Sequence, residues 1–80
     1  MKELMNRINQ FRDDRDWRKF HNEKDLAISI SLEASELLEL FQWKNSEEVV
    51  ESSLNEIKEE LADVLIYSLM MADNLNLDVE

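Results

Sequence analysis

The chain has no cysteine, no glycine and no proline among its 80 residues. Without cysteine no disulfide can form, and no motif for a structural zinc site is present. Glycine and proline usually punctuate hairpins and tight turns, so a sequence without them favours helices that run unbroken. These absences predict an all-α protein.

Basic residues are also few, since 19 acidic residues stand against 9 basic ones and the formal net charge is −10. Such a chain repels phosphate backbones, so we expect no binding to a nucleic acid polymer without a bound cation. No apolar run approaches the ~18 residues of a membrane-spanning helix, and the polar segment 1–12 is unlike a secretory signal. We therefore expect a cytoplasmic protein with no membrane partner.

The length of the chain limits the size of its core. Eighty residues usually form one small domain, which buries only about 60% of the surface that the unfolded chain exposes. Because neither a disulfide nor a zinc site supports this core, oligomerisation is the remaining common way to gain burial. We expect one domain over residues 1–80, associated as a homodimer or tetramer.

Apolar residues at helical spacing divide the chain into three predicted helices. They cover about residues 2–15, 26–43 and 46–72. The connector between the first two, residues 16–22, contains two aromatic residues and the only histidine. The second helix is so rich in leucine and isoleucine that we expect it to be enclosed on more than one side. Packed antiparallel, the second and third helices of two subunits would form a four-helix-bundle core.

Short polar side chains stand where the second and third helices begin. Asn22 or Asp25 is suited to cap the second helix, and Asn45 or Ser46 the third. A short side-chain oxygen at such a position can accept a hydrogen bond from a free amide of the first turn. In the first helix, Arg12 falls among the polar positions between apolar ones.

Four acidic residues lie on helix faces that are otherwise apolar. Glu33 and Glu36 are three residues apart, and Glu60 and Asp63 repeat this spacing, so each pair shares one helix face. Burying facing carboxylates is costly unless a positive charge compensates them. Lys and Arg are scarce on these faces, whereas Mg²⁺ takes oxygen ligands and leaves positions for water and phosphate. The pattern predicts a divalent cation site; the alternative is that acids fall on the core flank by chance, with their tips in water.

Three strings stand in a fixed order along the chain. Arg15-Asp16-Trp17 precedes Phe20-His21, the string from Glu33 to Trp43 begins with Glu-Ala-Ser-Glu, and residues 59–67 contain Glu60-Leu61-Ala62-Asp63. This order of Glu-x-x-Glu, spacer and Glu-x-x-Asp resembles the MazG-like all-α nucleotide pyrophosphohydrolases, especially their dCTP pyrophosphatase-like branch. The resemblance covers most of the chain.

The resemblance implies Mg²⁺-dependent hydrolysis of (deoxy)nucleoside triphosphates to a nucleoside monophosphate and pyrophosphate, as in house-cleaning of the nucleotide pool. It implies that Glu33, Glu36, Glu60 and Asp63 hold Mg²⁺, with Mn²⁺ as a substitute. Either Glu36 or Glu39 would orient the attacking water or take its proton. A bound cation would also attract anionic phosphates to an acidic chain.

Aromatic and polar side chains of the family-like strings are candidates for contacting the nucleotide. They are Trp17, Phe20, His21, Trp43, Lys44 and Tyr67. An aromatic ring offers a base a flat apolar surface, and Tyr67 is favoured because it lies one turn beyond Asp63. Core packing for the aromatic residues, and capping or exposure for His21 and Lys44, are the simpler roles.

Members of this family usually continue past the third helix into a segment that reaches the phosphates. Because the chain stops at residue 80, we expect this segment to be lacking, which favours an alternative: a non-catalytic acidic helical module that binds another protein. A ferritin-like di-iron bundle is a second alternative. Such bundles use Glu-x-x-His pairs, and His21 lies outside both acidic pairs.

Overall fold

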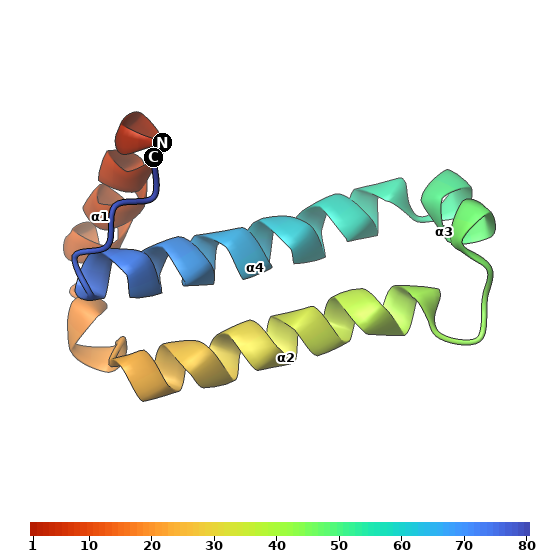
Figure 1. The fold of residues 1–80 in the computed structure, drawn as a ribbon, viewed down its shortest axis with the longest axis horizontal. Coiled ribbons are helices and arrows are strands. Elements are labelled where there is room, and N and C mark those ends of the chain that lie inside the picture. The colour runs from red at the N-terminus through yellow and green to blue at the C-terminus, as the bar shows by residue number, and fades with distance from the viewer.

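Two long antiparallel helices, α2 and α4, lie side by side and organise the molecule (Figure 1). The computed structural model describes residues 1–80 and is all-α, as predicted. Its helices are α1 (Lys2–Asp14), α2 (Glu23–Phe41), α3 (Ser46–Ser52) and α4 (Leu54–Asn74). α1 stands across one end of the long pair and α3 closes the other end (Figure 1). A 3-10 turn, η1 (Arg18–Phe20), links α1 to α2.

Two asparagines fix where α2 and α3 begin. The side chain of Asn22 accepts a hydrogen bond from the amide of Asp25 at 2.9 Å, and Asn45 does the same for the amide of Glu48 at 2.9 Å. Each bond satisfies an amide that has no partner inside its helix. Of the predicted alternatives, Asn22 and Asn45 are therefore the caps.

The single helix predicted over residues 46–72 is wrong, because the chain breaks at Ser53 into α3 and α4. Ser53 has φ −129° and ψ 30°, outside helical geometry. The neighbouring Ser52 donates its hydroxyl proton to the carbonyl of Glu48 at 2.8 Å. Local bonds of this kind compete with the helical ladder and lower the helix preference of serine.

The predicted end of the second helix is also wrong. α2 ends at Phe41, and Trp43 has a φ of 67° in the turn that follows. A left-handed conformation is costly for a bulky residue, and it reverses the chain toward α3. Trp43 therefore projects from a turn instead of continuing the apolar face of α2, and its side chain is 93% exposed.

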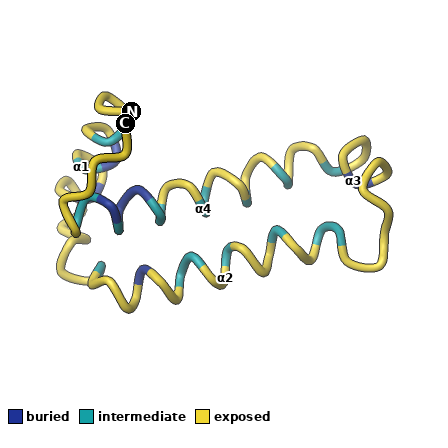
Figure 2. Tube along the Cα trace, in the orientation of Figure 1, coloured by how far each residue is buried: buried dark blue, intermediate teal, exposed yellow.

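The core is small and lies where α1 crosses the α2–α4 pair (Figure 2). It consists of Ile8, Leu26, Leu69 and Met70. Arg12 is fully buried beside it, which corrects its placement among the polar positions of the first helix. The physical reason is the helical repeat, since Arg12 lies one turn after Ile8 on the same face of α1.

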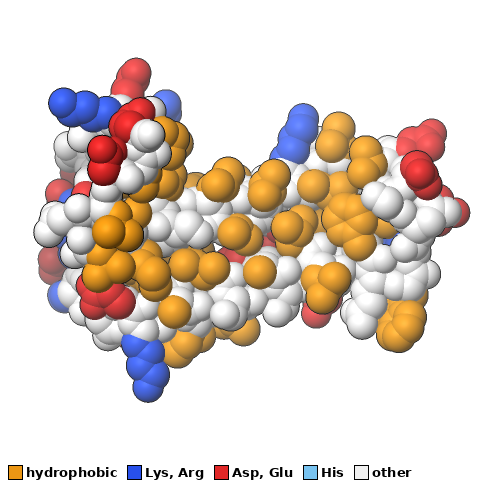
Figure 3. Space-filling view, in the orientation of Figure 1, with side chains coloured by type: hydrophobic (Ala, Val, Ile, Leu, Met, Phe, Trp, Pro, Cys, Tyr) orange, Lys and Arg blue, Asp and Glu red, His pale blue; other side chains and the backbone are white.

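Much of the apolar surface of the long helices faces solvent (Figure 3). On α2, Leu32 is 60% exposed and Leu38 is 64% exposed. The prediction that this helix is enclosed on more than one side is therefore wrong for a single chain. None of the α-helices has the length and hydropathy of a segment that crosses a membrane.

Candidate functional site

Three carboxylates from two helices meet between α2 and α4. One oxygen each from Glu33 and Glu36 on α2 and from Glu60 on α4 lies within 4.8 Å of the other two. Acidic side chains are visible in the seam between the long helices in Figure 3. The i, i+3 spacing puts both α2 acids on one face, and the antiparallel pairing brings Glu60 opposite them.

The carboxylates of this cluster have no positive partner. Oε2 of Glu33 and Oε2 of Glu60 are both buried and make no hydrogen bond. None of the ion pairs in the chain involves a residue of the cluster. Glu36 is exposed, so the cluster is open to solvent on its side. Burying carboxylate oxygens without a partner is costly, so the arrangement of Glu33 and Glu60 calls for a compensating group.

The surroundings of the cluster disfavour its charged form. Burial, together with the neighbouring Glu36 and Glu33, raises the pKa of Glu60 to about 7. Burial also raises the pKa of Glu33, with the negative charges of Glu36 and Asp63 acting in the same direction. Desolvation and like charges both favour a bound proton on a carboxylate. A cation at this position would relieve both causes.

The donor set fits a hard divalent cation. Three carboxylate oxygens from different side chains are near one another, and two of the side chains carry a buried oxygen without a partner. Mg²⁺ and Mn²⁺ bind through oxygen ligands and keep water in their remaining positions. The open side at Glu36 leaves room for such water.

Asp63 stands beside this cluster without belonging to the group of converging oxygens. It is half-buried on α4 and lines a small cavity of about 190 Å³ near the η1 end of the molecule. Aromatic and apolar residues form the other walls of the cavity: Phe11, Trp17, His21, Ile66, Tyr67 and Met70. Asp63 thus connects an acidic cluster to an aromatic cavity.

A buried arginine holds one wall of this cavity. Arg12 donates from Nε to Nδ1 of His21 at 3.2 Å and from Nη2 to Oδ1 of Asn74 at 2.9 Å. Asn74 in turn donates from Nδ2 to the backbone carbonyl of His21 at 2.6 Å. Nη1 of Arg12 lies 3.7 Å from Oδ2 of Asp73. Sequence reasoning missed Arg12 and Asn74, although the i, i+4 relation of Arg12 to Ile8 was available as a signal.

Outside the acidic cluster of Glu33, Glu36 and Glu60, the predicted site residues fall into two groups in space. Trp17, His21 and Tyr67 share the aromatic cavity with Asp63. The others do not line it: Phe20, Glu39, Trp43 and Lys44. Phe20 is 63% exposed, and Glu39 is exposed on α2. The turn with Trp43 and Lys44 lies at the opposite end of α2.

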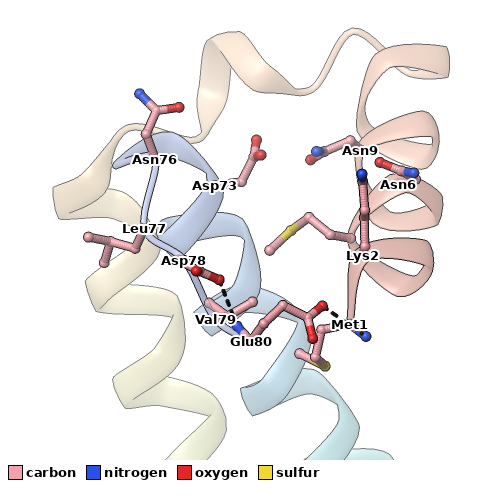
Figure 4. A pocket seen from close by; sticks show the side chains of 11 residues that line it. Met1, Lys2, Asn6, Asn9, Asp73, Asn76, Leu77, Asp78, Val79 and Glu80 are labelled. Atoms are coloured by element: carbon pink, nitrogen blue, oxygen red, sulfur yellow. Dashed lines mark hydrogen bonds and ion pairs between the residues drawn. The ribbon is translucent and has the colours of Figure 1, made fainter.

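The largest cavity of the chain, about 530 Å³, lies elsewhere. It is formed by α1, the end of α4 and the tail that follows, with Asn6 and Asn9 on one side and Asp73 on another (Figure 4). The amino group of Met1 pairs with Glu80 at 3.3 Å at its rim. It contains none of the predicted site residues, so volume alone does not identify the site.

Comparisons with known proteins agree on one family. Residues 28–80 match the model of the MazG-like family. The proteins named dCTP pyrophosphatase 1 from Bos taurus and from Homo sapiens are each 36% identical in an alignment 75 residues long, and the alignment covers 88% of this chain. The chain spans 44% of the length of these relatives.

A solved structure is similar over nearly the whole chain. The crystal structure of a pyrophosphatase from Archaeoglobus fulgidus has a TM-score of 0.93 and 48% sequence identity. The match covers 98% of this chain and 76% of that one. The arrangement of helices described above is therefore shared with a relative at the level of backbone and sequence.

We expect the stability of the metal-free protein to fall as the pH rises from about 4.5 to about 7. Glu60 binds its proton more tightly in the folded than in the unfolded chain, so its contribution is complete at low pH and lost through its folded pKa. The variant Glu60→Gln should melt at a higher temperature than the wild type at about pH 8 in EDTA. Thermal melts across this pH range measure both effects.

Glu56→Gln is the matched control, because Glu56 is exposed on the same helix and lies outside the cluster. It should keep the pH dependence of the wild type. A Glu60→Gln variant that melts at a lower temperature than the wild type at every pH would contradict the raised pKa of Glu60.

Proposed function

Because this chain belongs to the MazG-like family, we propose that it hydrolyses nucleoside triphosphates to a nucleoside monophosphate and pyrophosphate in a Mg²⁺-dependent reaction. The observation that carries this proposal is the convergence of Glu33, Glu36 and Glu60 from two helices. The relatives named dCTP pyrophosphatase 1 and the Archaeoglobus fulgidus pyrophosphatase support a nucleotide substrate and a phosphoanhydride bond. Removal of unwanted nucleotides from the pool is the proposed duty, and a cytoplasmic location stays a prediction.

In this proposal Glu33, Glu36 and Glu60 hold the cation, and Asp63 supports them from one turn beyond Glu60. A cation bound there would lower the pKa of a water and offset phosphate charge. Mn²⁺ would substitute, because it takes the same oxygen ligands. Such a cation would also attract the anionic substrate, which the net charge of −10 would otherwise repel.

Glu36 is the residue that we propose takes the proton of the attacking water, because it is the exposed member of the cluster. The water oxygen forms a bond to the α phosphorus, and the bond from that phosphorus to the oxygen bridging to the β phosphate breaks. Pyrophosphate leaves with the bonding electron pair. Glu39, exposed one turn beyond Glu36, is the second candidate for the proton acceptor.

The nucleoside end of the substrate is proposed to enter the aromatic cavity. Trp17 and Tyr67 offer ring surface there, and Asp63 places the cavity next to the carboxylate cluster. Stacking a base on an aromatic ring contributes roughly 1–3 kcal/mol in nucleic acid complexes. Phe20 does not line the cavity, so we do not assign it a contact with the base.

Trp43 and Lys44 require a second copy of the chain if they contact the same nucleotide. α2 has 19 residues, so its ends are about 28 Å apart at ~1.5 Å per residue. Trp17 precedes this helix and Trp43 follows it. Within one chain the two rings are therefore too far apart to touch one base.

We propose a homodimer or tetramer in which a second copy covers the exposed apolar face of α2 and α4. Seven large aliphatic residues of these helices are exposed in one chain: Ile28, Leu32, Leu38, Leu54, Leu61, Leu65 and Ile66. A monomeric protein seldom exposes large patches of such residues. Association would form the expected four-helix core and give Trp43 access to a neighbouring site.

The first test is hydrolysis. The chain is incubated with each common nucleoside triphosphate and Mg²⁺, and we expect a monophosphate and pyrophosphate to form in equal amounts. Glu36→Gln should lower the rate at least about a hundredfold, because it removes both a cation ligand and the proton acceptor. Glu47→Gln, an exposed acid at the start of α3, is the control and should keep the rate.

A folded sample that hydrolyses no nucleotide with either Mg²⁺ or Mn²⁺ would contradict the proposed reaction. That result would favour the alternative of a non-catalytic acidic helical module, whose exposed apolar face would bind another protein. Phosphate as the product, in place of pyrophosphate, would contradict the cleavage position.

The second test is association. Multi-angle light scattering over a range of concentrations should give the mass of a dimer or tetramer for the wild type. Leu65→Glu should dissociate it, because it places a charge in the proposed apolar interface. Asn55→Glu adds the same charge at another exposed position of α4 and should leave the mass unchanged. A wild type that is monomeric at every concentration would contradict the proposal.

A further inference from the structure

The hydrogen bonds of Arg12 determine where the proton of His21 lies. Arg12 is fully buried, and its Nε donates to Nδ1 of His21 at 3.2 Å. A guanidinium carries only donors and stays protonated in proteins. Nδ1 must therefore offer a lone pair, so the proton of a neutral imidazole lies on Nε2.

Asn74 reinforces this arrangement from α4. It accepts from Nη2 of Arg12 at 2.9 Å and donates to the backbone carbonyl of His21 at 2.6 Å. The ring and the backbone of His21 are thus held by two different partners that are themselves bonded to each other. Burial and the charge of Arg12 both lower the pKa of His21, which favours the neutral ring.

Only one nitrogen of His21 is left for the aromatic cavity. Arg12 occupies Nδ1, and Arg12 does not line the cavity, whereas His21 does. The ring of Trp17 stands edge-on to the ring of His21, with 6.1 Å between their centroids. At about 190 Å³ the cavity is smaller than the ~300 Å³ at the lower end for whole ligands, so it suits one part of a ligand, such as a base ring.

We propose that Arg12 is a positioning residue that fixes His21 as a neutral donor through Nε2, so that the cavity selects a nucleobase edge presenting a hydrogen-bond acceptor. The choice of a nucleobase rests on the proposed function. The state of the ring rests on Arg12 and Asn74 alone. A base whose edge offers only a donor at this point leaves Nε2–H unpartnered, which is how polar sites reject near analogues.

The ring state can be read directly, because His21 is the only histidine of the chain. Long-range ¹H–¹⁵N spectra of the uniformly labelled full chain at about pH 8 should show a protonated Nε2 and a bare Nδ1. In Arg12→Met the ring should exchange between both neutral tautomers. Arg18→Met is the matched control: Arg18 shares Asp73 with Arg12 but makes no hydrogen bond to the ring, so the wild-type pattern should persist.

The kinetic constants of the variants distinguish a loss of positioning at His21 from a general destabilisation of the fold. Arg12→Met should raise KM for the preferred nucleotide about tenfold and change kcat less than about twofold, since one hydrogen bond to the base is lost. The ratio of kcat/KM for the preferred nucleotide to kcat/KM for the other nucleotides should decrease. Arg12→Lys, which keeps a buried donor, should recover part of the loss, and Arg18→Met should keep both constants.

A wild-type ring that carries its proton on Nδ1 would overturn the proposal, whichever nucleotides are hydrolysed, and this spectrum decides the matter even if Arg12→Met does not fold. An equal rise in KM in Arg12→Met and Arg18→Met, with an equal loss of preference among nucleotides, would also overturn it. If no nucleotide is hydrolysed but the tautomer depends on Arg12, the proposed function fails while the positioning of His21 by Arg12 is supported.

Discussion

Glu33, Glu36 and Glu60 face one another across the seam between α2 and α4 without a positive side chain to offset them. Burial and mutual repulsion both oppose ionisation there, which is why the pKa of Glu60 rises to about 7. Apolar residues at the same positions would pack the two helices at lower cost. Stability therefore gives no reason for these acids, whereas the binding of a divalent cation does.

A second buried charge organises the other end of the molecule. Arg12 of α1 donates hydrogen bonds to Asn74 of α4 and to His21 in the segment before α2. Asn74 also donates a hydrogen bond to the backbone of His21. This arrangement places the aromatic cavity against α4, where Asp63 lies between the cavity and the acidic cluster. The aromatic cavity and the acidic cluster are thus neighbours along α4, which is the arrangement that the proposed nucleotide substrate requires.

Local rules were sufficient for part of this fold. Asn22 and Asn45 cap their helices because a cap depends on a few neighbouring residues. The spacing of the acidic pairs predicted shared faces, and the antiparallel helices bring Glu33 and Glu60 together.

Other features of the fold do not follow from the spacing of apolar residues. The break at Ser53 and the left-handed turn at Trp43 allow α3 to close one end of the helix pair, where Val49 is buried. Arg12 follows a polar pattern in sequence, yet it is buried because His21 and Asn74 satisfy its donors from distant parts of the chain. The helical periodicity of a sequence does not reveal hydrogen-bond partners that are distant along the chain.

The most direct measurement is the anomalous diffraction of Mn²⁺ in crystals of this chain grown with that ion. We expect a strong peak in the seam between α2 and α4, with carboxylate oxygens of Glu33, Glu36 and Glu60 as its ligands. A structure with Mn²⁺ bound only elsewhere, or with these side chains turned outward in separate directions, would contradict the role assigned to the acidic cluster.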